Sequence, residues 1–142
     1  MGSEIPPVTV AEVMHRGLIA VVPQTPLVEA AELMAANRVH CVIVDGTARD
    51  SANRERPVWG ILCDLDLMRA FATGSTDGSA GELAATEIVT VDPATEIEEV
   101  ARLMAEHDSS HLVVVENGRP AGVVSSLDVA QGVTVARHIG VS

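Results

Sequence analysis

An internal repeat restricts the fold of this 142-residue chain more than any other feature of its sequence. Residues 21–25 (Val-Val-Pro-Gln-Thr) correspond to residues 91–95 (Val-Asp-Pro-Ala-Thr), and residues 31–35 (Ala-Glu-Leu-Met-Ala) correspond to residues 101–105 (Ala-Arg-Leu-Met-Ala). Each repeat is small for a stable core of its own, so the two are expected to fold as a pair. The predicted boundaries are 1–7 for a disordered start, 8–72 for the first repeat, 73–78 for a linker, 79–138 for the second repeat and 139–142 for a tail.

Helix signals recur at the same places in both repeats. Thr9 and Ser79 can each open a short helical turn. Thr25 is predicted to cap a longer helix with Pro26 at its first position, and Thr95 is predicted to cap the corresponding helix of the second repeat. Both longer helices carry an apolar face at helical spacing, formed by Leu27, Ala30, Ala31 and Met34 in the first repeat and by Ile97, Val100, Ala101 and Met104 in the second.

Unbroken runs of β-branched and apolar residues follow these helices. They predict strands buried on both faces at residues 41–44 and 112–115. Asn117-Gly118 predicts a tight hairpin in the second repeat, whereas residues 46–57 of the first repeat are expected to form a polar, mobile surface loop. Shorter strands are predicted at 18–22 and 88–91, and closing helices at 64–72 and from 126 to about 138. The element order predicts an α/β (α+β) fold with two small three-stranded sheets, each packed with helices.

Composition excludes several classes of function. The formal net charge is −11 and all nine basic residues are arginine, so the chain is expected to repel nucleic-acid phosphates and anionic membrane surfaces. Trp59 and Phe71 are the only aromatic residues, which leaves no platform for stacking bases. No apolar run reaches the length of a membrane span and no export signal is evident, so a cytoplasmic location is expected.

No pattern in the sequence predicts an enzyme. A Ser-His-Asp grouping in a recognisable context, a Gly-x-x-x-x-Gly-Lys phosphate loop and any lysine are all missing. His107 and His111 are four residues apart but straddle a helix end and a strand start, so no metal site is expected. Cys41 and Cys63 fall in apolar strand-like runs, and they are expected to be buried free thiols rather than a redox pair.

The stretch from Gly122 to Asp128 is the best candidate for a binding site, and Gly60 to Asp66 is a weaker copy of it. Each reads as a buried strand that runs directly into the first turn of a helix. Such a junction is expected to leave unpaired N–H groups and the positive end of a helix dipole facing one spot, which suits an anion. Ser125 or Ser126 can cap this helix end, and Asp128 can accept hydrogen bonds from a ligand hydroxyl. The alternative is an ordinary capped turn without a ligand.

These elements, in this tandem order, resemble the cystathionine-β-synthase (CBS) domain pair, also called a Bateman module. The resemblance covers residues 8 to 138 and rests on three motifs: a strand ending in Val-x-Pro, a helix containing Leu-Met-Ala, and a closing Gly-h-h-(Ser/Thr)-x-x-Asp, where h is apolar. Because little of the chain is left over, a stand-alone pair is expected. The resemblance implies two small sheets related by a pseudo-two-fold axis. It also implies that AMP, ADP, ATP, S-adenosylmethionine or sometimes NAD binds in two clefts between the repeats.

The resemblance also implies which residues touch the ligand. In the closing motif the Ser/Thr contacts phosphate and the Asp holds the ribose hydroxyls, so Ser125 and Asp128 match fully, with Ser126 beside them. The first repeat offers Cys63 and Asp66 instead. A thiol is a weak hydrogen-bond donor, and Asp64 adds a second carboxylate at the same helix end. The second-repeat site is therefore expected to be the better phosphate site, and the first-repeat site to be empty or to prefer a nucleoside without phosphate.

Other positions follow from the family pattern with less support. Basic residues at the start of the second strand often reach ligand phosphates, and His40 and His111 stand there; the alternative for both is an exposed histidine at a strand edge. Adenine packs against apolar residues of the first strand, although these positions would be apolar without a ligand. They are Ile19, Val21, Val89 and Val91.

The sequence thus predicts a cytosolic sensor of adenosine nucleotides that changes conformation on binding and acts on an unknown protein target. The alternative is a dimerisation module whose clefts have lost their ligand. CBS pairs commonly form homodimers through the helices that follow the closing motifs. The residues expected on that face are Leu65, Leu67, Met68, Val129, Val133 and Val135.

Overall fold

The computed structural model of the chain describes residues 8–141, so the disordered start predicted for residues 1–7 lies outside the described residues. The described chain divides into two compact units. The first-repeat unit contains residues 19–88, and the second-repeat unit contains residues 8–18 together with residues 89–141. None of the helices in the described range is long and apolar enough to cross a membrane.

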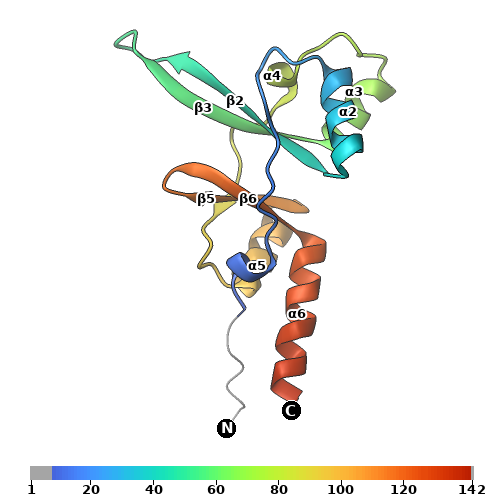
Figure 1. The fold of residues 1–142 in the computed structure, drawn as a ribbon, viewed down its shortest axis with the longest axis vertical. Coiled ribbons are helices and arrows are strands. Elements are labelled where there is room, and N and C mark those ends of the chain that lie inside the picture. Colours follow the sequence, from blue (N-terminus) through green and yellow to red (C-terminus); the bar gives the residue numbers. More distant parts are fainter. Residues whose placement is uncertain (1–7, 142) are drawn as a thin grey trace. The chain divides into compact units, whose positions relative to one another are not determined.

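The first-repeat unit is a three-stranded sheet with helices packed on it (Figure 1). The strand order is β1-β2-β3, in which β1 runs parallel to β2 and β2 runs antiparallel to β3. Its elements are β1 (Ala20–Val21), α2 (Leu27–Asn37), β2 (Cys41–Arg49), β3 (Glu55–Cys63), α3 (Asp64–Ala72) and α4 (Ala80–Leu83).

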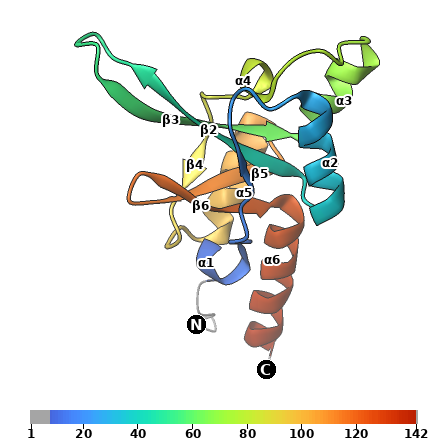
Figure 2. The same ribbon diagram turned by 45° about the horizontal axis from the view of Figure 1, so that its top comes forward.

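The second-repeat unit has the same arrangement, with the strand order β4-β5-β6 and the same parallel and antiparallel pairings. Figure 2 shows α1 beside α6 in this unit, and the two helices are in contact. The elements are α1 (Val10–Val13), β4 (Thr90–Val91), α5 (Ile97–His107), β5 (His111–Glu116), β6 (Arg119–Ser125) and α6 (Ser126–Val141). The predicted α/β fold with two small three-stranded sheets is confirmed.

The opening helix of each repeat belongs to the unit of the other repeat. Helix α1 precedes the first repeat in the chain, yet the Val10 N–H donates to the Thr95 carbonyl at 2.8 Å in the second-repeat unit. Helix α4 precedes the second repeat, yet the Ala80 N–H donates to the Thr25 carbonyl at 2.7 Å in the first-repeat unit. Backbone groups make both contacts, so no side-chain pattern in the sequence predicts that each opening helix joins the unit of the other repeat.

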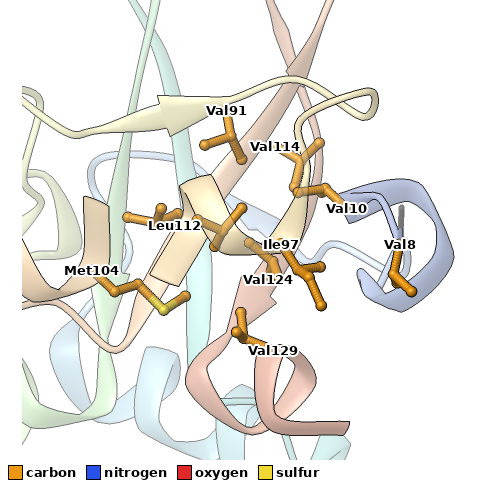
Figure 3. Packing of buried hydrophobic residues seen from close by; sticks show 10 residues of the cluster. Val8, Val10, Val91, Ile97, Met104, Leu112, Val114, Val124 and Val129 are labelled. Carbon is orange, nitrogen blue, oxygen red and sulfur yellow. The ribbon is translucent and has the colours of Figure 1, made fainter. Parts of the chain in front are cut away.

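Each unit has its own aliphatic core. In the second-repeat unit, side chains from α1, all three strands, α5 and α6 converge on one cluster (Figure 3). Val100, Val114 and Val124 are completely buried there. The first-repeat unit buries Leu27, Leu62 and Ala30 equally well, within a cluster that also contains Val21, Met34, Val42, Val44, Leu67 and Ala80. Burying each of the Val, Leu, Ile and Met side chains contributes about 1.5–3 kcal/mol.

The hairpin predictions had different outcomes. Asn117 (φ 53°) and Gly118 (φ 77°) form the predicted tight turn between β5 and β6. The mobile loop predicted for residues 46–57 is wrong, because β2 and β3 stay paired from Cys41 opposite Cys63 to Arg49 opposite Glu55. Figure 1 shows this hairpin extending beyond the helices of its unit. Its turn is closed by Asp50, whose carboxylate accepts hydrogen bonds from the N–H groups of Ala52 (2.9 Å) and Arg54 (3.0 Å).

The predicted helix caps are also wrong, by one residue each. Helix α2 follows Pro26 rather than Thr25, and α5 follows Glu96 rather than Thr95. The reason is a tertiary contact, because a carbonyl group of a neighbouring segment accepts a hydrogen bond from the first N–H of each helix. Leu27 donates to the Gly78 carbonyl at 3.2 Å, and Ile97 donates to the Val8 carbonyl at 3.1 Å. These backbone bonds satisfy donors that a side-chain cap would otherwise serve.

Candidate functional site

The closing motif of the second-repeat unit joins the end of β6 to the first turn of α6. The Ser125 N–H donates to Asp128 Oδ2 at 2.8 Å, and the Asp128 N–H donates to Ser125 Oγ at 3.1 Å. This reciprocal pair is a capping box. The Ser126 N–H donates to the Ser110 carbonyl at 2.9 Å. The expectation of unpaired N–H groups is therefore wrong for these three residues, because the motif satisfies them internally.

Asp128 also holds a histidine that the sequence did not suggest. His15 Nε2 lies 2.8 Å from Asp128 Oδ1; the Asp128 side chain is 4% exposed and the His15 side chain is 77% exposed. The backbone fixes His15 at this place, since its N–H and its carbonyl each bond to Val123 at 2.9 Å. A buried carboxylate therefore orients an exposed imidazole. The corresponding contact of the first-repeat unit is made by Ala85, so the repeat carried no signal for His15.

The closing motif of the first-repeat unit has the same backbone geometry with different side chains. The Cys63 N–H donates to Asp66 Oδ2 at 2.9 Å, and the two residues form the capping box of α3. The Asp66 side chain is 34% exposed, and its Oδ1 lies 3.9 Å from Arg69 Nη1. Asp66 is thus more open to a ligand than Asp128, whereas Cys63 replaces a hydroxyl with a thiol.

The structure places the two predicted histidines differently. His111 begins β5 and lies directly opposite Ser125 in the β5–β6 pairing, so the sheet brings these two candidates together. Its Nδ1 lies 3.0 Å from Ser110 Oγ. His40 precedes β2, and its Nδ1 lies 2.9 Å from Asp64 Oδ2. His40 is therefore next to a carboxylate at the start of α3.

The apolar candidates divide into two groups. Val21 and Val91 are only 9% and 7% exposed and belong to the cores of their units. Ile19 and Val89 are half-buried and pack against those cores from outside. Ile19 and Val89 are therefore better placed than Val21 and Val91 to meet a ligand.

A shallow depression of about 410 Å³ lies at β4 and α5 of the second-repeat unit. Two of its polar side chains have partners: the Thr95 hydroxyl accepts the Asp92 N–H at 3.2 Å, and the Glu99 carboxylate pairs with Arg102. The guanidinium of Arg102 holds the pKa of the Glu99 carboxyl below its usual range. Of the predicted site residues the depression includes only Val91. Within the described residues, no group of three or more His, Cys, Asp or Glu side chains could hold a metal ion.

Exposed apolar side chains lie on the two helices that follow the closing motifs. Leu65 (54%) and Met68 (53%) on α3 are exposed as the predicted dimer face requires. The assignment of Leu67 and Val129 to that face is wrong, because they are 1% and 7% exposed and fill the cores. Leu127 was overlooked and is the most exposed of these residues. The exposed residues on α6 are Leu127 (66%), Val133 (50%) and Val135 (52%).

Comparison with known proteins gives consistent matches. The family model described as CBS domain matches residues 10–73 and 80–134. Hypoxic response protein 1 of Mycobacterium tuberculosis is 27% identical over 126 residues, which cover 87% of this chain and 83% of that protein.

Two solved structures show the same fold. The CBS domain pair of protein MJ0100, in complex with 5′-methylthioadenosine and S-adenosyl-L-methionine, has a TM-score of 0.74 at 19% identity and covers 92% of this chain and 98% of its own. Hypoxic Response Protein I with two coordinated zinc ions has a TM-score of 0.65 at 28% identity. The match covers 87% of this chain and 98% of that chain.

Proposed function

This chain belongs to the CBS domain family, and from that premise we propose that it is a regulatory module that binds adenosine-containing ligands at its closing motifs. The observation that carries the proposal is the recurrence of one capping-box geometry, Ser125 with Asp128 and Cys63 with Asp66, at the end of the last strand in both units. The complex of the MJ0100 domain pair with two adenosyl ligands supports the class of ligand. The module is proposed to act without catalysing a reaction.

The second-repeat motif is proposed to bind a phosphorylated nucleoside such as AMP, ADP or ATP. Ser125 Oγ accepts the Asp128 N–H, which leaves its O–H free to donate to a phosphate oxygen. His111, opposite Ser125 in the sheet, and His15, hydrogen-bonded to Asp128, are proposed to make further polar contacts with the ligand. Ser126 is exposed at the first position of α6, where the helix dipole favours an anion.

The first-repeat motif is proposed to bind a nucleoside without phosphate. Cys63 is a weaker donor than serine. Asp64 adds a second carboxylate to the first turn of α3, where it repels a phosphate. The exposed part of Asp66 suits the hydroxyls of a ribose, which donate to a carboxylate. His40, next to Asp64, is the candidate of this unit for a further polar contact.

A panel of AMP, ATP, NAD, S-adenosylmethionine and adenosine tests the proposal by thermal shift. A ligand at a hundred times its dissociation constant adds about 2.7 kcal/mol to the free energy of unfolding. At least one member is expected to raise the melting temperature. If all of them leave it unchanged at millimolar concentration, the chain is not a sensor of adenosine ligands.

A reciprocal exchange tests the assignment of the two motifs. Ser125→Cys copies the first motif into the second and is expected to weaken AMP binding about ten- to a hundredfold, because a hydrogen bond to a charged group contributes about 1.5–3 kcal/mol. Cys63→Ser is expected to strengthen AMP binding at the first motif. Ser51→Cys, which adds a thiol at the exposed hairpin tip, is the control. Calorimetry that finds two AMP sites of equal affinity in the unaltered protein contradicts the assignment.

The ligand is proposed to change how the module presents its surface to a second copy and to a protein target. The two cysteines of this chain are free thiols, which is typical of proteins in a reducing compartment. The cytoplasm is therefore the proposed location. A ligand-free dimerisation module is the second candidate, since the closing N–H groups are satisfied internally and Leu127, Val133 and Val135 are exposed. Sedimentation at micromolar concentration distinguishes the two: a ligand-independent dimer that binds none of the panel favours the second candidate, and a monomer excludes it.

A further inference from the structure

Two cysteines face each other across the sheet of the first-repeat unit. Cys41 is the first residue of β2 and Cys63 is the last residue of β3, and they are direct partners in the antiparallel register. The Asp64 N–H donates to the His40 carbonyl at 2.8 Å, one residue outside this pair on each strand. That bond identifies Cys41 and Cys63 as a non-hydrogen-bonded pair, the type in which opposite Cα atoms approach to about 4.5 Å.

This separation is compatible with a disulfide. Disulfides span Cα distances of about 4.4–6.8 Å, so the pair lies at the short end of the range without movement of the strands. Cross-strand Cβ atoms are about 4.5–5.5 Å apart or somewhat closer at such pairs, against about 3.8 Å in a disulfide. The bond therefore requires a small inward movement of the two side chains. Strain of this kind makes a disulfide easier to reduce.

The fold itself does not require sulfur at this place. The same pair of positions in the second-repeat unit holds His111 opposite Ser125, with the same outer bond from the Ser126 N–H to the Ser110 carbonyl at 2.9 Å. Both cysteines are half-buried, and neither belongs to the buried core cluster of its unit. Core packing therefore does not account for them.

We propose that Cys41 and Cys63 form a reversible intrachain disulfide when the protein meets a small-molecule disulfide such as oxidised glutathione. The thiolate of one of the two cysteines attacks one sulfur of oxidised glutathione and releases one glutathione thiolate. The thiolate of the other cysteine then attacks the protein sulfur of the mixed disulfide and releases the second. The two protein thiols lose two protons and two electrons, and one molecule of oxidised glutathione becomes two of glutathione.

The surroundings of the two thiols act on them differently. A side-chain hydrogen bond with Cys63 lowers the pKa of Cys41 below its usual value. The same hydrogen bond, together with burial and the carboxylates of Asp64 and Asp66, raises the pKa of Cys63. Cys63 also caps the N-terminus of α3, a position that favours a thiolate, so either cysteine can start the exchange.

Oxidation would also act on α3. Cys63 is the N-cap of this helix, and its sulfur faces the Asp66 N–H in the capping box. A sulfur drawn into a disulfide with Cys41 leaves that position, so the first turn of α3 loses part of its cap. The consequence for ligands rests on the proposed function, because Cys63 and Asp66 form the first-repeat motif. At the first-repeat motif, the oxidised protein is expected to bind adenosine several-fold more weakly than the reduced protein.

The test uses the full chain in buffers with increasing ratios of oxidised to reduced glutathione. After an acid quench and alkylation, mass spectrometry is expected to show a monomer lighter by two hydrogen atoms, with a peptide that links Cys41 to Cys63. Reduction should restore both thiols. Cys41→Ser and Cys63→Ser should each abolish the link. The quadruple variant that moves the pair to the second repeat (C41S, C63S, H111C, S125C) should form the corresponding disulfide.

The outcomes separate the claims. Two thiols that remain open to alkylation under oxidising conditions, or links only between different chains, overturn the proposed disulfide. A disulfide that forms without changing the affinity for adenosine overturns its consequence for the ligand and leaves the modification site standing. The absence of adenosine binding to the reduced protein refutes the ligand proposal alone, because the disulfide is detected without any ligand.

Discussion

Gly122 allows the segment after α1 to lie directly on β6, so an added methyl group should separate the two. A Cβ at this position would lie 2.2 Å from Met14 Cε and 2.5 Å from the His15 carbonyl oxygen. The Met14 methyl group can move aside, but the His15 carbonyl is held by the Val123 N–H at 2.9 Å. Gly122→Ala must therefore lift the backbone at His15 from the strand.

The expected cost follows from these contacts. Two backbone hydrogen bonds join His15 to Val123, and each contributes about 0.5–1.5 kcal/mol. Overpacking a well-filled site costs about 1–3 kcal/mol. Replacing glycine by alanine returns about 0.4–1 kcal/mol through the unfolded state. Because lifting the segment relieves the overpacking, the terms do not simply add, and we expect Gly122→Ala to lower the free energy of unfolding by about 2–3 kcal/mol.

Urea denaturation followed by far-UV circular dichroism measures this change. With a urea dependence of about 1–3 kcal/mol per molar, the midpoint should fall by about 1 M. Trp59 is the only tryptophan and lies in the first-repeat unit, so its fluorescence reports whether that unit follows the other. Gly17→Ala is the matched control, since no atom lies within 4 Å of its added Cβ. A Gly122→Ala midpoint equal to that of Gly17→Ala would refute the reasoning.

Three further predictions concern the core, the hairpin and the dimer face. Leu62→Ala should lower the free energy of unfolding by about 2–5 kcal/mol, whereas Leu127→Ala, at a side chain that is 66% exposed, should change it by less than about 0.5 kcal/mol in urea titrations. Arg56 and Arg54 hold the pKa of the Asp50 carboxyl below its usual value, so their support of the hairpin is present above the unfolded pKa and is lost as the pH falls through the lower folded value. The protection of the turn amides from hydrogen exchange, relative to the intrinsic rate at each pH, should fall there and should show no such change in Asp50→Asn. Leu127→Glu should weaken homodimers at least about tenfold in sedimentation velocity, and an unchanged association would remove Leu127 from the interface.

Much of the architecture could be predicted because local sequence patterns determine the types of its elements. Helical spacing and β-branched runs depend on whether a residue faces a core, so the sequence identified both sheets and the helices of the described residues. The bounds of α3 (Asp64–Ala72) and the Asn117-Gly118 turn were predicted correctly for the same reason. The tandem order of these elements was also sufficient to indicate the CBS family.

Local patterns failed where a partner from elsewhere in the chain replaced a local interaction. Thr25 and Thr95 have the chemistry of helix caps, but the carbonyls of Gly78 and Val8 accept the first helical N–H groups. The family resemblance placed Leu67 on the dimer face, although its side chain is buried in the core.

The sequence by itself determined the repeat, the element types, the aliphatic cores and the residues of the two closing motifs. Only the tertiary structure decided which unit receives each opening helix, that His15 meets Asp128, and that Cys41 lies opposite Cys63. The physical reason is that hydrophobic spacing records the environment of each residue along its own element. Pairing between distant segments depends on backbone N–H and carbonyl groups, which are the same in nearly every residue and leave no mark on the sequence.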